Sequence, residues 1–318
     1  MLPLPDGHTF PMAKYSRLRE LVVSEGIIDA GDLRVPDAAT RDELVLVHTP
    51  RYVDAVIDGT LDAREQRRIG FPWSPAMAER ARRSVGATIA ATREALNAGL
   101  TASAKATAVR RSVPRRRKAC ATGAACATGA SANLAGGTHH GFPDHGEGYC
   151  VFNDVAVAAR IAQRDHGIAR VLVIDLDVHQ GNGTAAIFAD DPSVFTLSIH
   201  AASNFPFRKE QSDLDVELPD GTGDLAYLSA LDESLDTALQ RFQPELIFYV
   251  AGADPYEGDR LGKLSLSVEG LRERDSRVVD LASRAGAPLV VTMAGGYCAD
   301  VDVIARIHAN TLREVSQG

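Results

Sequence analysis

The sequence has few cysteines and no long apolar run. None of its four cysteines belongs to a Cys-x-x-Cys pair, and four are too few for a disulfide framework in a chain of 318 residues. Residues 1–6 lack the basic, apolar character of a signal peptide, and no stretch reaches the roughly 18 apolar residues that a membrane span requires. We therefore expect a soluble, unexported protein that resides in the cytoplasm and does not bind membranes.

Basic residues are also in deficit. The chain has 34 Lys and Arg against 42 Asp and Glu, and this net charge of −8 disfavours direct binding to nucleic acid, which usually needs a basic face. Hydrophobic residues make up 45% of the chain, enough for a large buried core. The composition therefore indicates a globular protein rather than a disordered or fibrous one.

Apolar runs alternate with helical patterns in the second half of the sequence, which predicts βα units on a parallel sheet. Five runs contain no charge, as strands covered on both faces must: 132–136, 171–174, 194–199, 246–251 and 289–293. Apolar spacing predicts helices at 14–24, 74–98, 153–166, 225–242 and 268–285. The pattern is typical of an α/β protein.

The stretch 102–130 interrupts this pattern. It is rich in Ala, Thr and Arg, and the hexapeptide Ala-Cys-Ala-Thr-Gly-Ala occurs twice in tandem, at 119–124 and 125–130. It carries seven basic residues and no acidic one. This composition predicts a disordered surface insertion that could lie against an acidic body.

Carboxylates and an imidazole follow two of the expected strands. Asp175, Asp177 and His179 alternate along the chain, so their side chains share one face and converge beyond the carboxyl end of the strand, where open α/β sheets bind ligands. Asp254 follows the run 246–251 and could complete a three-ligand metal site with one open position, the form of a catalytic zinc site. Taken alone, Asp254 could equally be a turn residue before Pro255.

Two other strand ends carry groups for proton transfer. The pair His139-His140 follows a Gly-Gly-Thr segment after the run 132–136, and Tyr297 follows Gly295 and Gly296 after the run 289–293. The glycines allow close approach of the backbone to a ligand, and the phenol is a hydrogen-bond donor. Four strand ends together thus predict a metal site, a general base pair and an oxyanion donor.

With these motifs in place, the sequence resembles the histone deacetylase family over nearly the whole chain apart from 102–130. Gly-Gly-Thr-His-His, Gly-Glu-Gly-Tyr-Cys-Val-Phe-Asn-Asp, Asp-Leu-Asp-Val-His-Gln-Gly-Asn-Gly-Thr, Ala-Gly-Ala-Asp-Pro and Ala-Gly-Gly-Tyr occur in the order typical of the family. The opening Leu-Pro-Leu-Pro-Asp-Gly-His-Thr-Phe-Pro-Met is most similar to the class IV branch and its bacterial relatives. The resemblance implies one deacetylase domain over 1–318 with the arginase/deacetylase fold: three α/β/α layers around a mostly parallel sheet of about eight strands.

The resemblance also assigns roles. It implies that one Zn2+ per chain is held by Asp177, His179 and Asp254. His139 and His140 would share the roles of general base and general acid, and Tyr297 would donate a hydrogen bond to the tetrahedral oxyanion. In the same family pattern Asp175 lies beside His139, and Asn182 lies beside His140.

Further positions carry over from the family pattern. Gly148, Tyr149, Phe205, Leu261 and Gly295 match residues that line a narrow channel for the acyl-lysine chain, although ordinary core packing is a fair alternative for Phe205 and Leu261. Asp175 and Ser198 match a site for a structural K+ or Na+ ion behind the zinc.

The expected reaction is removal of acetyl or longer acyl groups from lysine side chains in a protein or peptide, or from a small acylated amine such as an acetylpolyamine. An arginase-like ureohydrolase with two manganese ions would need another carboxylate close after His179, where Gln180, Gly181 and Asn182 stand. A non-catalytic acyl-lysine binding module would not need the His139, His140 and Tyr297 set. Ferrous iron remains an alternative to zinc, because an Asp-His-Asp site accepts either ion.

Overall fold

The computed structural model describes residues 2–5, 7–110 and 129–317 of the chain. Within these ranges one sheet has the strand order β1-β6-β5-β2-β3-β4, and every neighbouring pair is parallel. The strands are β1 (Ala130–Asn133), β2 (Val171–Asp175), β3 (Val194–Ala201), β4 (Leu214–Leu218), β5 (Leu246–Val250) and β6 (Leu289–Thr292). The predicted α/β fold with a parallel sheet is confirmed, with six strands in the described ranges instead of about eight.

All five charge-free runs form strands, which confirms that uninterrupted apolar runs mark the buried strands here. The sixth strand, β4, was not predicted because Asp215 and Glu217 alternate with its apolar residues. It is the last strand in the sheet order, and its first four residues keep some exposure. An edge strand needs only one buried face, so its pattern alternates where the central strands read as continuous apolar runs.

Ten helices surround the sheet in the described ranges. They are α1 (Lys14–Ser24), α2 (Arg41–Leu44), α3 (Pro50–Asp58), α4 (Ala63–Ile69), α5 (Pro75–Arg110), α6 (Asp154–His166), α7 (Asn182–Phe188), α8 (Asp224–Arg241), α9 (Val268–Ala285) and α10 (Val301–Gln317). Local signals fix several of their ends. At α6, for example, the Asn153 side chain accepts a hydrogen bond from Ala156 N, and Gly167 ends the helix at φ 68°.

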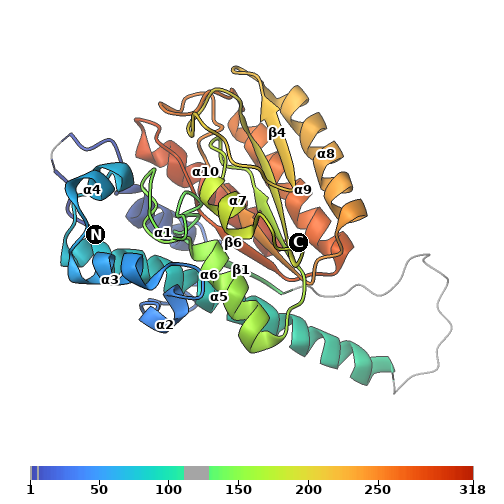
Figure 1. Cartoon of the computed structure of the whole chain (residues 1–318). Helices are drawn as coiled ribbons and strands as arrows, with labels where there is room; N and C mark the ends of the chain where they lie inside the picture. Colours follow the sequence, from blue (N-terminus) through green and yellow to red (C-terminus); the bar gives the residue numbers. More distant parts are fainter. Residues whose placement is uncertain (1, 6, 111–128, 318) are drawn as a thin grey trace.

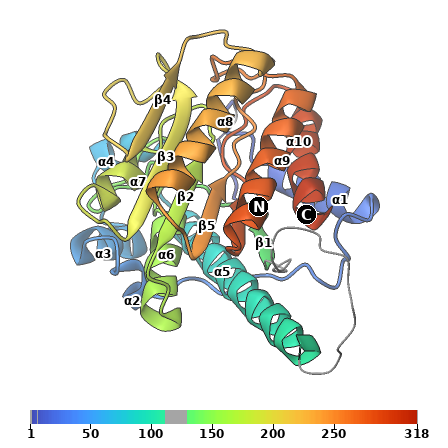
Figure 2. The same ribbon diagram turned by 90° about the vertical axis from the view of Figure 1, so that its right-hand side faces the viewer.

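The layers follow from the alternation of side chains along each strand. Val171 and Val173 of β2 pack into a core with helices α3, α5 and α6, whereas Leu172 and Ile174 face a second core with α1, α8, α9 and α10. Figures 1 and 2 show the sheet between these two sets of helices. The three-layer α/β/α arrangement is therefore confirmed.

Helix α5 corrects the predicted boundary of the insertion at 102–130. The helix continues to Arg110, so residues 102–110 are helical rather than irregular. Alanine has the highest helix propensity, and the alanine-rich composition of this segment suits a helix even without amphipathic periodicity. The strand β1 begins at Ala130, and the remainder of the predicted insertion, 111–128, lies outside the described residues.

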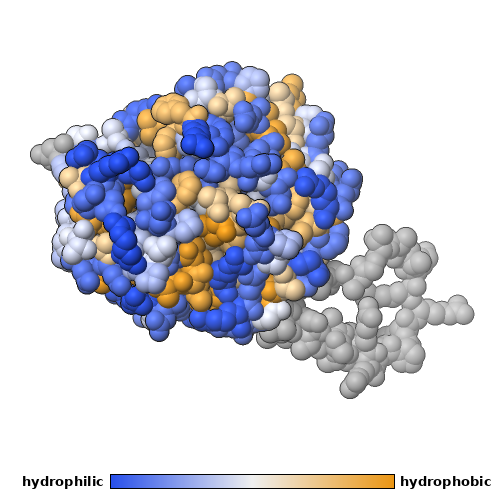
Figure 3. Space-filling model, viewed as in Figure 1, coloured by the Kyte–Doolittle hydropathy of each residue, from blue (hydrophilic) through white to orange (hydrophobic). Residues whose placement is uncertain are grey.

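No helix in the described part of the chain is long and apolar enough to cross a membrane. The face shown in Figure 3 carries hydrophilic residues interspersed with smaller hydrophobic patches. The apolar residues are instead concentrated in the two cores on either side of the sheet.

Candidate active site

Four neighbouring strands carry the predicted site residues. The strands β1, β6, β5 and β2 are adjacent in the sheet. Their register aligns Asn133 with Thr292, Thr292 with Val250, and Val250 with Asp175, so all four strands end at nearly the same level. The loops that follow them therefore meet at one edge, as the sequence predicted for the carboxyl ends of parallel strands.

Asp177, His179 and Asp254 form a buried cluster at this edge, and each offers a ligand atom within 4.8 Å of the others. Nδ1 of His179 lies 3.0 Å from Oδ1 of Asp177 and 3.3 Å from Oδ2 of Asp254. Apart from this ion-pair contact with His179, Oδ2 of Asp254 is buried and has no hydrogen-bond partner in the described part of the chain. A buried carboxylate oxygen that makes no hydrogen bond is costly unless a cation meets it, so this cluster fits a divalent metal ion.

The charges in the cluster are strongly coupled. Burial raises the pKa of Asp254, the Asp177 carboxylate raises it further, and the result is about 6. Burial opposes ionisation of Asp177 too, but the nearby His139 and the hydrogen bonds from His179 lower its pKa overall. Two carboxylates this close together in a buried site favour the binding of a cation between them.

Glycines leave space for this cluster. A β-carbon at Gly295 would stand 1.8 Å from Oδ2 of Asp254, and one at Gly252 would stand 2.7 Å from the backbone of Asp177. The backbone N–H of Gly295 donates to Oδ2 of Asp177 at 2.7 Å. The backbone also orients the carboxylate of Asp254, because the N–H of Val178 donates to its Oδ1 at 3.0 Å.

The adjacent histidines have different partners. Nδ1 of His139 donates to Oδ2 of Asp175 at 2.6 Å, and Nδ1 of His140 donates to Oδ1 of Asn182 at 2.7 Å, as the resemblance implied. Burial lowers the pKa of His139, but the carboxylates of Asp175 and Asp177 outweigh it and raise that pKa to about 9. Burial and the nearby His139 hold the pKa of His140 well below its usual value. The two imidazoles therefore differ in basicity, and His139 is the more basic.

Tyr297 is held beside the cluster by its backbone. Its N–H donates to Oδ2 of Asp259 at 2.5 Å, and its carbonyl accepts from Nε of Arg260 at 2.6 Å. Burial raises the pKa of the phenol well above its usual value, and the carboxylates of Asp254 and Asp177 raise it further. The hydroxyl therefore stays protonated and remains a hydrogen-bond donor.

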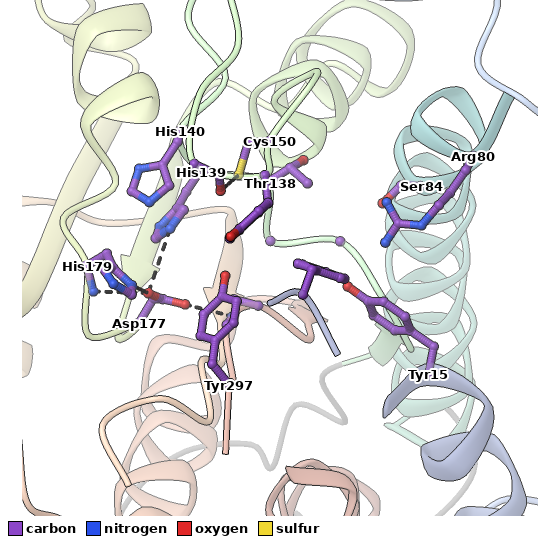
Figure 4. A pocket seen from close by; sticks show the side chains of 17 residues that line it. Tyr15, Arg80, Ser84, Thr138, His139, His140, Cys150, Asp177, His179 and Tyr297 are labelled. Carbon is purple, nitrogen blue, oxygen red and sulfur yellow. Dashed lines mark hydrogen bonds and ion pairs between the residues drawn. The ribbon is translucent and has the colours of Figure 1, made fainter. Parts of the chain in front are cut away.

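A cavity connects these groups, and Figure 4 shows Tyr297 between the His139, His140 and His179 side and a second side formed by Tyr15, Arg80 and Ser84. Of the predicted channel residues, Gly148, Tyr149 and Gly295 line the cavity. Phe205 does not line it but packs edge-on against His140, with ring centroids 5.0 Å apart. Leu261 does not line it either, and the residue is 40% exposed.

Some lining residues were missed from the sequence. Phe10, Tyr15, Arg80 and Ser84 come from the N-terminal third, which carries no strand in the described ranges. The only sequence signal for any of them was the opening motif that contains Phe10. Lys14 was missed as well: it is almost fully buried, and its Nζ donates to the carbonyl of Ala294 at 2.9 Å, next to Gly295.

The predicted site for a monovalent ion has its two residues side by side. Ser198 of β3 pairs in register with Asp175 of β2, and both are buried. Oγ of Ser198 lies 3.0 Å from Nδ1 of His200, and Oδ1 of Asp175 accepts from Asp177 N at 3.2 Å. A K+ or Na+ ion at this position remains a prediction.

Comparison with known proteins gives consistent matches. A family model described as the histone deacetylase domain matches residues 8–315. A relative from Picosynechococcus sp., described only as an uncharacterized protein, is 41% identical over 96% of this chain and 92% of its own length. The histone deacetylase-like amidohydrolase of Pseudomonas aeruginosa is 32% identical over 93% of this chain and 74% of its own. Among solved structures, an HDAC homolog complexed with SAHA matches with TM-score 0.75 and 25% identity, over 99% of this chain and 80% of that one.

Proposed function

The chain belongs to the histone deacetylase family and is a hydrolase that acts on amides, and from this premise we propose that it removes acetyl or longer acyl groups from lysine side chains with the help of one zinc ion. The observation that carries the proposal is the buried cluster of Asp177, His179 and Asp254, of which Asp177 and His179 line one cavity together with His139, His140 and Tyr297. We further propose that residues 1–318 form one deacetylase domain.

Asp177, His179 and Asp254 would hold the metal. Two carboxylates and one imidazole leave a coordination position open, as catalytic zinc sites require, and the same set suits ferrous iron. When bound, zinc supplies Lewis acidity, which polarises the amide carbonyl and makes water more acidic. The neighbouring backbone N–H groups of Val178 and Gly295 fix the two carboxylates for this task.

The protein's own groups would then move the protons. Nδ1 of each imidazole is engaged by Asp175 or Asn182, so Nε2 of His139 and Nε2 of His140 are the ring nitrogens left for the reaction. One imidazole takes a proton from the attacking water, and the other delivers one to the leaving amine. The protonated hydroxyl of Tyr297 donates to the oxygen that gains negative charge.

The similarity of the opening motif to the class IV branch favours long-chain acyl-lysine at least as strongly as acetyl-lysine. The lining of the cavity continues past Tyr297 to Tyr15, Arg80 and Ser84 (Figure 4). A small acylated amine, such as an acetylpolyamine, is the second candidate substrate.

The test combines metal content with hydrolysis. Purified protein is stripped with a chelator, restored with zinc or with ferrous iron under anaerobic conditions, and assayed on acetyl-lysine peptide, myristoyl-lysine peptide and an acetylpolyamine. We expect one bound metal per chain and zinc-restored hydrolysis of both peptides, with myristoyl-lysine at least as fast as acetyl-lysine. Metal binding without turnover of any substrate would instead identify an acyl-lysine binding module.

A further inference from the structure

A carboxylate stands behind the amide that supports His140. Oε1 of Glu147 accepts a hydrogen bond from Nδ2 of Asn182 at 2.6 Å, while Oδ1 of the same Asn182 accepts from Nδ1 of His140 at 2.7 Å. The three side chains therefore form a relay that leads from a partly exposed carboxylate to a buried imidazole at the cavity.

The direction of this relay follows from which groups can donate. A carboxylate only accepts hydrogen bonds, so the NH2 group of Asn182 must face Glu147, and its oxygen must then face His140. Asp175, which supports His139, has two equivalent oxygens and needs no such orientation. An amide without a fixed partner can rotate and present its NH2 group instead, and His140 would then lose its proton from Nδ1.

We propose that Glu147 is a positioning residue: it holds the Asn182 amide so that His140 carries its proton on Nδ1 and keeps Nε2 free to accept one. Nε2 is the nitrogen left for the cavity, so the opposite tautomer would place a proton where the reaction needs an acceptor. The inference rests on the proposed function, because it assigns a role within the same reaction.

The backbone fixes Glu147 for this role. The carbonyl of Glu147 accepts from Cys150 N at 2.8 Å, which closes a tight turn, and the next residues Gly148 and Tyr149 have φ of 55° and 66°. The end of helix α4 holds the turn, because Arg68 O accepts from Gly148 N at 3.2 Å. A β-carbon at Gly148 would stand 2.6 Å from Cδ2 of His140, so the turn also packs directly against that ring.

Two substitutions separate orientation from charge. Glu147→Gln keeps an oxygen that can accept from Asn182 but removes the charge, so its kcat should stay within about threefold of wild type. Glu147→Leu removes the acceptor, and we expect kcat to fall by about tenfold or more with little change in KM, as for loss of a partner that orients a functional histidine. Asp144→Leu removes an exposed carboxylate from the same loop and should leave kcat unchanged.

The second arm repeats Glu147→Leu in an Asn182→Asp background. An aspartate presents an acceptor in either orientation, so the loss caused by Glu147→Leu should disappear there. A merely structural role of Glu147 would reduce kcat equally in both backgrounds and would overturn the inference. Equal losses in Glu147→Gln and Glu147→Leu, or wild-type kcat in Glu147→Leu, would overturn it too.

A spectroscopic measurement keeps this test independent of turnover. In protein labelled with 15N-histidine, the two ring nitrogens of His140 report which one is protonated. We expect Nδ1 to be protonated in wild type and in Glu147→Gln, and Nε2 in Glu147→Leu. If wild type hydrolyses no acyl substrate, the proposed function fails. The positioning role of Glu147 is then rejected only if His140 has the same tautomer in Glu147→Leu as in wild type.

Discussion

Gly295 lies so close to Asp254 that a β-carbon at position 295 would stand 1.8 Å from Oδ2 of that carboxylate. The contacted atom belongs to Asp254, so the contact could be relieved only by moving this proposed metal ligand. The glycine in this strand-end motif is therefore explained by steric contact with the cluster of Asp177, His179 and Asp254.

We expect Gly295→Ala to displace Asp254 and to lower zinc affinity by about tenfold or more. Competition with a chelating dye measures the dissociation constant directly. Gly31→Ala is the matched control, because its β-carbon would meet no atom within 4 Å, and its zinc affinity should equal that of wild type. Unchanged affinity in Gly295→Ala would show that the cluster tolerates a shift that the structure does not allow.

Asp254→Ala should remove the metal itself. The substitution deletes one of the three proposed ligands and the oxygen that has no hydrogen-bond partner within the described residues. We expect zinc content after dialysis to fall from one ion per chain to near zero, measured by elemental analysis. Asp236→Ala, which removes an exposed carboxylate, should keep its zinc.

Tyr297→Phe should separate metal binding from catalysis. The ring contact with Phe10 and the backbone hydrogen bonds of residue 297 do not involve the hydroxyl, so the fold and the zinc content should be retained. We expect kcat to fall by about 10²–10³, the typical contribution of an oxyanion donor. Wild-type turnover in this variant would remove Tyr297 from the mechanism.

His48 makes the stability of the fold depend on pH. Its Nδ1 donates to the Phe142 carbonyl at 2.9 Å and its Nε2 accepts from Asn153 N at 3.0 Å, an arrangement that only the neutral ring allows. Burial lowers the pKa of His48 to about 4. The stabilisation is therefore complete above the unfolded pKa of about 6.5 and is lost as the pH falls through 4.

By this linkage, His48 should cost wild type about 2 kcal/mol of unfolding free energy between pH 7 and pH 5. Urea unfolding at both pH values measures the loss, and His48→Gln should show a pH dependence smaller by that amount. The comparison isolates His48 because the buried His200 and His308, whose pKa values burial also lowers, are present in both proteins. Equal pH dependence in the two proteins would contradict this assignment.

The sequence predicted the sheet and most of the strand-end chemistry, for a physical reason. Buried strands are mostly apolar, so a carboxylate at the end of β2 (Asp175) and those just beyond β2 and β5 (Asp177 and Asp254) stand out from the apolar runs. The Asn153 cap and the Gly167 that end helix α6 at its two termini are local signals of the same kind. The residue roles derived from the family pattern remain proposals.

What the sequence could not predict depends on contacts between distant segments. The burial of Lys14 against the Ala294 carbonyl joins residues 280 positions apart, and no local pattern signals it. The role of Glu147 depends on a turn that α4 holds in place and on the rotation of one amide. Charged and apolar residues alternate in β4, which is typical of an edge strand. A search for charge-free runs does not detect such a strand.

The relay between Glu147 and Asn182 has an evolutionary consequence. An aspartate at position 182 would face the Glu147 carboxylate at the distance where Asn182 now donates a hydrogen bond, and two like charges that close repel each other. The two positions should therefore not change independently: lineages that replace Asn182 with aspartate should also lose the acidic residue at 147.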